Sequence, residues 1–322
     1  MREDQKEGAA TEPQALTQLG LPAEPGGPQV LDTAETPISA LTTRQLAWRR
    51  FRRHKLAMGS GIALILLTVA TVLGPVISRY NFHQIDILNR AQGPSRAHWF
   101  GTDLLGRDEF VRVLYGGRIS LVVGLSVALS AGILGAVVGS LAGFYGGWID
   151  NILMRVTVLF LAFPFLVILI IASRLLGGSV LDVVILLTIF FWMADARIVR
   201  GVFLSMKEKE FVEAARASGA RSRRIIFYHM LPNAMGPIIV NVTLGVAAAI
   251  LTESALSFLG FGIQPPTPSW GNLLDSAQDA AITSPWLVWF PGLMILITVL
   301  CVNYLGDGLR DALDPHGKVT EA

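Results

Sequence analysis

The side chains that most often bind metal ions are few in this chain and are not grouped. The five histidines form no i,i+4 pair and have no cysteine neighbour; they are His54, His83, His98, His229 and His316. The single cysteine, Cys301, lies in an apolar run, so the sequence allows no disulfide framework. We therefore expect no metal site.

A glycine loop that would bind phosphate is also missing from the sequence. Gly317-Lys318 is followed by Val319 and lacks the earlier glycine that such a loop requires. No nucleophile–base pair or metal set is recognisable, so the sequence does not predict an enzyme. Any ATP and magnesium on which the protein depends are expected to be bound by other chains.

The ionisable residues within apolar segments are the next candidates for chemistry, because such groups usually face a cavity or a partner. Glu253 lies beside Thr252 and Ser254 near the predicted outer end of one such segment. These three residues are candidates for lining a translocation path. The alternative is a structural pair between Glu253 and an arginine of an outer loop, and the sequence leaves both possibilities open.

A second apolar segment carries charges of both signs. Asp195 is expected to pair with a neighbouring basic residue. Arg197 and Arg200 lie one helical turn apart, and we expect their side chains to reach the lipid head groups.

The composition indicates that the elements around these residues lie in a membrane. Hydrophobic residues make up 52% of the 322 residues and charged residues 16%, whereas a soluble domain is about one-quarter charged. A bilayer requires roughly 20 apolar residues in a helix. Six stretches reach that length: 56–78, 119–144, 152–176, 180–202, 235–256 and 286–305. The predicted fold is an all-α integral membrane protein with six transmembrane helices.

Two local features of these stretches concern helix geometry. Gly135, Gly139 and Gly143 are spaced by four residues, which puts them on one helix face and predicts close approach of another helix. Phe163-Pro164 interrupts the third stretch, and we expect a kink there.

Loop charges predict the orientation of the chain. The connection between the fourth and fifth stretches is basic, with Lys207, Lys209, Arg216, Arg221, Arg223 and Arg224. The connection between the fifth and sixth has no lysine or arginine. Basic loops stay in the cytoplasm, so both termini are expected to be cytoplasmic. The outer loop, 79–118, also contains arginines and conflicts with this rule, although its length weakens it as a signal.

The regions outside the predicted spans divide into four segments. Residues 1–40 are polar and rich in proline, and we expect a disordered cytoplasmic tail. Residues 41–55 are basic with aromatic residues among them, which favours an interfacial helix on anionic lipid, although a plain topology signal would look the same. Residues 316–322 form a short C-terminal tail. The region with the six predicted spans covers 56–315 and contains the cytoplasmic segment 203–232.

That segment, 203–232, is too polar to cross a membrane and too long for a minimal turn. Its first part has a helical pattern, and Gly219 provides a stop signal. A second helical piece is expected to end before Pro232, at the entrance to the fifth span. The sequence therefore predicts a short helix–turn–helix at the cytoplasmic surface, with a turn of small residues that a partner can approach closely.

Several spaced motifs carry a resemblance to a known family. Glu213-Ala214-Ala215, three residues, Gly219, and later Leu231-Pro232 resemble the EAA loop of ABC importer permeases. Histidine at 229 is common in the peptide and nickel branch. The segments 101–108, 256–260, 264–271 and 306–315 resemble the second, C-type permease of that branch. The resemblance covers about 44 to 315.

The resemblance implies a type I ABC importer made of several chains. They are this permease, a second permease, one or two kinds of ABC ATPase, and an extracellular solute-binding protein. The chain would lie among the lipids of the bacterial inner membrane, bind no nucleic acid and form half of a path for peptides or similar solutes. The EAA loop would couple the path to the ATPases, with Glu213 as an anchor. The alternative for Glu213 is a helix-face charge in water.

One competing class is a self-contained secondary transporter or channel. Such proteins usually show internal repeats and charges at the bilayer midplane. The sequence has no convincing repeat, and midplane charges are sparse. The substrate is not readable from the sequence, since nickel chelates, glutathione, haem and sugars use similar permeases.

Overall fold

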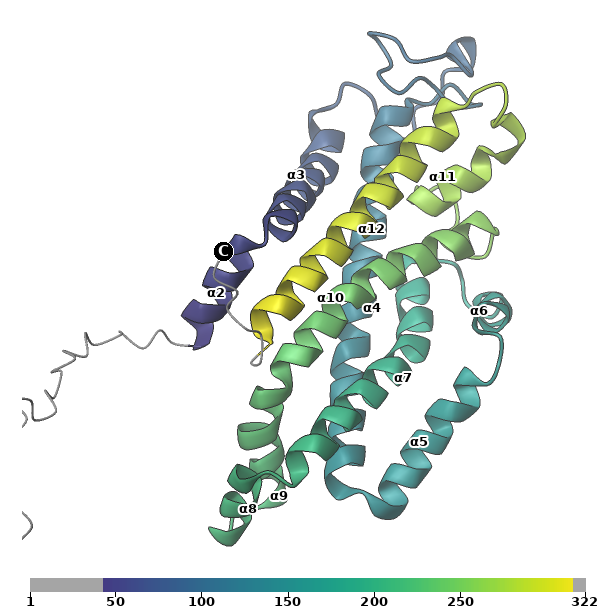
Figure 1. Cartoon of the computed structure of the whole chain (residues 1–322). Helices are drawn as coiled ribbons and strands as arrows, with labels where there is room; N and C mark the ends of the chain where they lie inside the picture. Colours follow the sequence, from purple (N-terminus) through teal and green to yellow (C-terminus); the bar gives the residue numbers. More distant parts are fainter. Residues whose placement is uncertain (1–42, 315–322) are drawn as a thin grey trace, which may run out of the picture. The chain divides into compact units, whose positions relative to one another are not determined.

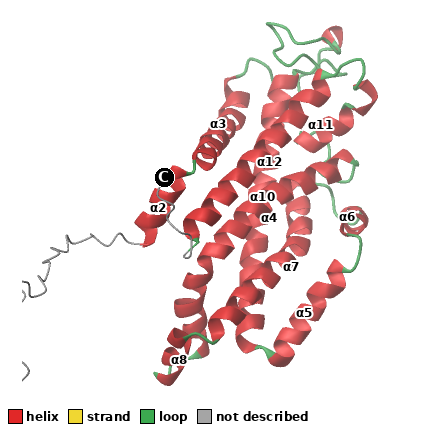
Figure 2. Cartoon of the chain, in the orientation of Figure 1, coloured by secondary structure: helices red, strands yellow, loops and turns green. Residues whose placement is uncertain are grey.

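The structure is a computed structural model that describes residues 43–314. The predicted tails at 1–40 and 316–322 lie outside these residues. The helices are α2 (Thr43–Arg53), α3 (Lys55–Ile77), η1 (Ile87–Asn89), α4 (Glu109–Tyr145), α5 (Gly147–Leu161), α6 (Phe165–Ser173), α7 (Val180–Lys207), α8 (Glu210–Ala217), α9 (Ser222–Arg224), the π-helix η2 (Ile225–Met230), α10 (Leu231–Phe258), α11 (Trp270–Ser276), η3 (Gln278–Ala280) and α12 (Trp286–Leu313). Figure 2 shows helices joined by loops throughout this part of the chain.

Four described helices are long and apolar enough to cross a bilayer. They are α3, α4, the continuous helix Ser222–Phe258 and α12. The pair α5 and α6 passes the same test only when taken together, and its two parts are bent by 84°. The structure thus has four or five apolar spans by length and composition, and the predicted number of six is not established by it.

The predicted third span, 152–176, is broken where a kink was expected. Pro164 cannot donate a backbone hydrogen bond, and it disfavours helical geometry at Phe163. α5 therefore ends at Leu161 and α6 begins at Phe165. The bend separates the two short helices in Figure 1, and it turns their phenylalanines towards α7, as the ring contacts of Phe160 and Phe165 with Phe190 show.

The glycines of α4 lie against the backbone of α7. A Cβ atom at Gly135 would come within 2.9 Å of the Ala196 nitrogen, and one at Gly143 within 2.6 Å of the Phe203 Cβ. At Gly139 it would lie 2.8 Å from the Val199 Cβ, closer than two carbons can pack. The two helices therefore approach backbone to backbone over three turns.

The start of α4 is held by a turn rich in charged groups. Asp103 Oδ1 accepts backbone hydrogen bonds from Leu105 at 2.8 Å and Arg107 at 2.9 Å. Asp103 Oδ2 pairs with the guanidinium groups of Arg107 and Arg112. Asp108 caps α4 by accepting from a backbone N–H of its first turn. These contacts fix the loop that precedes α4 to the first turns of this helix.

The short helix α11 is wedged between α4 and α10. Trp270 is fully buried, its Nε1 donates to the Val113 carbonyl at 3.0 Å, and its backbone nitrogen donates to the Ser120 hydroxyl at 3.2 Å. A Cβ at Gly271 would lie 2.5 Å from the Ser254 carbonyl oxygen, so only glycine fits there. α11 thereby joins the N-terminal part of α4 to the C-terminal part of α10.

α2 lies beside the end of α12, where the predicted interfacial segment, 41–55, was expected to be helical. His54 caps α3 by accepting from the Ala57 nitrogen at 3.1 Å, and its Nε2 lies 3.8 Å from Asp311. Arg50 donates to the Asp314 carbonyl at 2.7 Å. A contact with lipid is not among these interactions and stays a prediction.

We predict that Gly139→Leu destabilises the protein. The new side chain would collide with the α7 backbone, and overpacking of this kind costs roughly 1–3 kcal/mol or more. The apparent melting temperature of the purified protein in detergent should fall. Gly59→Leu is the matched control, since a Cβ at Gly59 meets nothing within 4 Å, and it should leave the melting temperature nearly unchanged. Equal melting temperatures for the two variants would contradict the proposed role of the α4 glycines in close packing against α7.

Candidate functional site

The predicted EAA segment forms a small helical lobe at the end of the bundle where α7 finishes and α10 begins. We define the EAA lobe as residues 208–230, which contain α8, α9 and η2. Figure 1 shows α8 and α9 together at this end, far from α11. The lobe is thus carried by two long helices, one entering it and one leaving it.

One buried residue attaches α8 to the rest of the chain. Val212 is fully buried, and it belongs to an apolar cluster with Phe203 and Met206 of α7 and with Ile225 and Met230 of η2. The cluster continues into α10 and reaches the end of α4. Any displacement of α8 is therefore resisted by, and passed to, the helices that form this cluster.

The turn after α8 is a Schellman motif, in which a left-handed residue closes the helix. Gly219 has φ +77°, its nitrogen donates to the Arg216 carbonyl at 2.9 Å, and the Ala220 nitrogen donates to the Ala215 carbonyl at 3.0 Å. The predicted stop at Gly219 is where the structure ends α8. A Cβ at Gly219 would meet nothing within 4 Å, so the backbone angle requires glycine and the space beside it is open.

Pro232 does not interrupt the helix, although a break in the helix was expected before the fifth span. The helix runs without interruption from Ser222 to Phe258, and Leu231 donates its backbone N–H to the Ile226 carbonyl, five residues earlier. The wider π-helical turn accommodates a residue that lacks an N–H donor. Leu231 and Pro232 are consequently the first residues of α10 and lie outside any loop. The predicted segment 203–232 contains mostly helix.

The exposed face of α8 carries the other predicted residues. Glu213, Ala214, Ser218 and Gly219 are exposed, whereas Ala215 is partly buried against the cluster around Val212. The Glu213 carboxylate has no hydrogen-bond or ion-pair partner within the described part of the chain. Small residues around an unpaired carboxylate leave this face accessible to another protein.

Two exposed aromatic residues of the lobe were missed by the sequence reasoning. The relative exposures of Phe227 and Tyr228 on η2 are 53% and 77%, large for aromatic side chains beside a buried cluster. Arg216 is also exposed, and its guanidinium carbon lies 5.7 Å from the centre of the Phe144 ring. An aromatic pair within an otherwise polar segment was the signal available in the sequence.

Glu253 lies inside the helix bundle, and its role in lining a path stays a prediction. It is fully buried, and its carboxylate accepts from Ser257 at 2.7 Å, Ser120 at 3.3 Å and Ser254 at 3.4 Å. The arginine partner considered for it is therefore replaced by serine hydroxyls. Thr252 donates to the carbonyl of Ala248 on its own helix. The structure thus brings Glu253 and Ser254 into the contact between α10, α4 and α11, and leaves Thr252 outside it.

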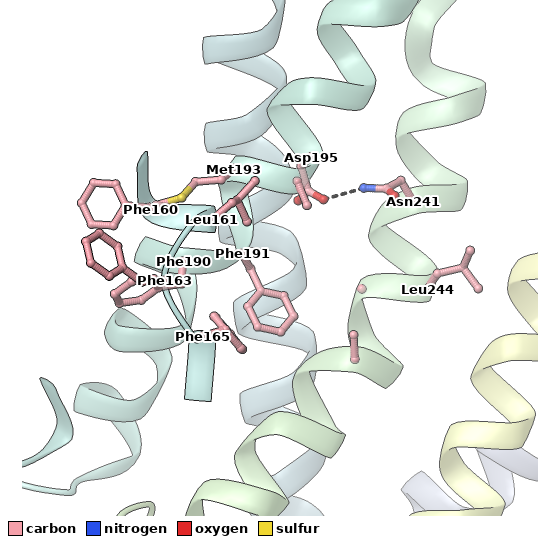
Figure 3. A pocket seen from close by; sticks show the side chains of 13 residues that line it. Phe160, Leu161, Phe163, Phe165, Phe190, Phe191, Met193, Asp195, Asn241 and Leu244 are labelled. Carbon is pink, nitrogen blue, oxygen red and sulfur yellow. Dashed lines mark hydrogen bonds between the residues drawn. The ribbon is translucent and has the colours of Figure 1, made fainter. Parts of the chain in front are cut away.

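Two charged residues of α7 have side-chain partners on neighbouring helices. Arg200 makes a two-pronged pair with Asp150 of α5, at 2.5 and 2.6 Å. Arg197 is exposed, and the contact of both arginines with lipid head groups stays a prediction. Asp195 accepts a hydrogen bond from Asn241 of α10 at 2.5 Å, where a basic partner was expected (Figure 3). α7 therefore joins α5 and α10 through polar contacts.

The described residues contain no group of three or more histidine, cysteine, aspartate or glutamate side chains that could hold a metal ion.

Comparison with known sequences identifies the family. The sequence model for a binding-protein-dependent transport system inner membrane component matches residues 135–318, over half of the chain. The chain belongs to this family. A second model, for the N-terminal transmembrane domain of oligopeptide transport permease C, matches residues 42–94.

Full-length relatives agree with this family assignment. The chain is 40% identical to a dipeptide transport system permease of Alkalihalophilus pseudofirmus, over 88% of this chain and 93% of the relative. It is 41% identical to an oligopeptide transport system permease of Bacillus subtilis, over 91% and 96%. It is 44% identical to a glutathione transport system permease of Shigella dysenteriae, over 84% and 90%.

These matches confirm the resemblance read from the sequence. The chain is a C-type permease subunit of an ABC importer and a multi-pass membrane protein. ATP hydrolysis lies in separate subunits, so the chain is not itself an enzyme. A self-contained secondary transporter or channel does not fit this family.

We predict that Val212→Ala loosens the EAA lobe. Removing two buried methyl groups should cost about 2 kcal/mol, and it should speed amide hydrogen exchange across Glu210–Ala217. Glu210→Ala, on the exposed face of the same helix, should change this exchange little. Unchanged exchange in Val212→Ala would show that α8 is held by contacts other than the Val212 cluster.

Proposed function

We propose that this permease forms half of a translocation path for small peptides and is driven by ATPases through the EAA lobe. The three relatives are named for dipeptides, oligopeptides and glutathione, which share the chemistry of short peptides. This common chemistry supports peptides over nickel, haem or sugar as the solute class.

The observation that carries the coupling role is the contrast between the two sides of α8. Val212 on the inner side is fully buried, while Glu213 on the outer side has no partner among the described residues. A rigidly attached helix that presents an unpaired carboxylate and small residues is suited to a groove on another subunit. Glu213 would anchor the lobe there by a charge-assisted hydrogen bond or ion pair, with Ala214, Ala215 and Gly219 giving close approach.

The mechanism that follows is mechanical. When nucleotide closes the ATPase pair, α8 moves with its groove, and the Val212 cluster carries the motion to α7 and α10. Both helices extend through the bundle, so a displacement at the lobe tilts them as rigid bodies. The path would then open alternately to either side, which requires two states that nucleotide biases. ATP and magnesium would be held entirely by the ATPase subunits.

The proposed assembly contains a second permease, one or two kinds of ATPase, and an extracellular solute-binding protein in the bacterial inner membrane. We further propose six spans with both termini in the cytoplasm, in which α5–α6 and α7 each cross. The partners of α7 support its crossing, since Asp150 and Asn241 reduce the cost of its charged groups in a bilayer.

Glu213→Ala should uncouple transport. Loss of a charge-assisted hydrogen bond typically costs 1.5–3 kcal/mol, so binding of the ATPase subunits should weaken about tenfold or more. Uptake by proteoliposomes that contain the whole system should fall, while the chain still inserts. Glu210→Ala removes an exposed carboxylate from the same helix and should leave uptake near the wild-type level.

Gly219→Arg should also reduce uptake and weaken the binding of the ATPase subunits, because the arginine side chain fills the open space beside the turn. Gly219→Ala imposes a similar backbone cost at φ +77° with a much smaller side chain, so it separates strain from steric exclusion. Wild-type uptake and ATPase co-purification in Glu213→Ala and Gly219→Arg would sink the coupling proposal.

The proposed topology predicts which thiols a membrane-impermeant maleimide can reach. In a Cys301→Ser background, Leu175→Cys and Asp279→Cys should react in intact spheroplasts, because both positions are exposed and are placed outside. Glu208→Cys should react only after permeabilisation. If Leu175→Cys behaves like Glu208→Cys, α7 does not cross and the six-span arrangement is wrong.

A further inference from the structure

An acidic group in the middle of α7 faces a cavity lined by aromatic rings. Asp195 is the sixteenth of the 28 residues of α7, and its partner Asn241 is the eleventh of the 28 residues of α10. The cavity beside them has a volume of about 350 Å³ (Figure 3). Both residues line it, so a polar pair is presented to the cavity well away from either helix end.

Asp195 differs from Asp103 and Asp150 in having no countercharge in the described part of the chain, and from Glu253 in facing a cavity. Asp103 pairs with two arginines, and Asp150 pairs with Arg200. Glu253 has serine donors and is closed off from any opening. Within the described residues, the Asp195 carboxylate has Asn241 as its hydrogen-bond partner and no lysine, arginine or histidine. A neutral amide orients the carboxylate but cannot balance its charge.

Phenylalanines from two parts of the chain form the wall of the cavity. Phe160, Phe163 and Phe165 come from the broken pair α5–α6, and Phe190 and Phe191 come from α7. The Phe165 ring centre lies 5.9 Å from that of Phe191 and 6.1 Å from that of Phe190, so the rings form one linked surface. The 84° bend at Pro164 places the first group opposite the second.

Ring faces together with a single carboxylate are the chemistry that recognises an organic ammonium group. The electron-rich faces attract the cation, the carboxylate balances its charge, and the apolar rings accept the carbon atoms attached to it. Arginine fits less well, because one oxygen of the carboxylate is already held by Asn241, which disfavours a two-pronged pair with a planar guanidinium group. A volume of about 350 Å³ is sufficient for an amino-acid residue.

We propose that this cavity is a subsite for the ammonium group of the transported solute. This inference rests on the proposed transport of peptides, whose free amino terminus carries such a group. Asp195 binds the ammonium, Asn241 orients the carboxylate, and the phenylalanines of α5–α6 and α7 enclose the adjoining side chain. Because the site is built on α7 and α10, the two helices attached to the EAA lobe, a change in their spacing would admit or release the group.

The test uses the complete importer in nanodiscs, with a reporter thiol in the cavity. Ala248→Cys is introduced in a Cys301→Ser background, since Ala248 is exposed and lines the cavity. Labelling by N-ethylmaleimide is measured with millimolar tri-alanine, N-acetyl-tri-alanine or N-acetyl-Ala-Lys-Ala. Tri-alanine should slow labelling several-fold, and N-acetyl-tri-alanine should not. Protection by the acetylated lysine peptide would show that a side-chain ammonium is also accepted.

Asp195→Asn is the decisive variant, because it keeps the shape of the side chain and its hydrogen bond but removes the charge. It should abolish protection by tri-alanine, and Phe190→Leu should weaken it. Asp279→Asn removes an exposed acid elsewhere and should leave protection unchanged. Equal protection by both alanine peptides, unaltered protection in Asp195→Asn, or a reporter thiol that reacts in no variant would each overturn the inference.

Two further readouts distinguish the proposed subsite from a contact between Asp195 and the second permease, and from a failure of the proposed peptide transport. If Asp195→Asn loses the second permease on purification, the missing countercharge belongs to that subunit and the subsite does not exist. Uptake of tri-alanine by the wild-type system tests the proposed function itself. Absence of uptake rejects peptide transport, whereas normal uptake with an insensitive Asp195→Asn rejects the subsite alone.

Discussion

Backbone contact between α4 and α7 is the constraint on which the rest of the bundle depends. Gly135, Gly139 and Gly143 place no α4 side chain between the two helices, so α7 is fixed in both distance and rotation. α7 carries more charge than the apolar helices around it. Its rotation decides that Arg200 meets Asp150 and that Asp195 faces the cavity instead of lipid. A looser contact between α4 and α7 would leave Arg200 and Asp195 without defined partners.

The EAA lobe and the aromatic cavity share the same two supporting helices. Ile238 of α10 belongs to the cluster around Val212, and Asn241 follows it by about one turn of the same helix. Phe203 of α7 belongs to that cluster too, and Asp195 precedes it by about two turns. The surface proposed to meet the ATPases and the site proposed to meet the solute are therefore mechanically continuous, without an intervening loop that would absorb movement.

The parts of this arrangement that sequence could predict are those set by local residue type. The apolar stretches located the long helices, Gly219 marked the end of α8, and the spacing of Glu213, Gly219 and Pro232 identified the family. Pro232 was misread because its effect depends on the preceding turn, which is π-helical and tolerates the missing donor. The break at Pro164 was underestimated, since a proline alone does not specify the size of a bend.

Local sequence patterns could not predict contacts between segments that lie far apart in the sequence. Asp150 and Arg200 are 50 residues apart, and Ser120 and Glu253 are 133 residues apart. The charges of Arg200 and Glu253 suggested generic lipid or arginine partners, and only the packing of α5 against α7 and of α4 against α10 shows which groups meet. The aromatic cavity was missed for the same reason, because its phenylalanines read simply as apolar residues of two spans.

The π-helical turn η2 sets the angular phase between the EAA lobe and α10. Each residue of an α-helix turns the chain by about 100°, and a π-helical turn accommodates one residue more than an α-helical turn. Deleting a single residue within Ile225–Met230 would let the segment close as ordinary α-helix. The EAA lobe would then rotate about the axis of α10, while the chemistry of the buried and exposed sides of α8 stayed the same. The number of residues in η2, independent of any side chain, thus determines the direction in which the proposed coupling face points.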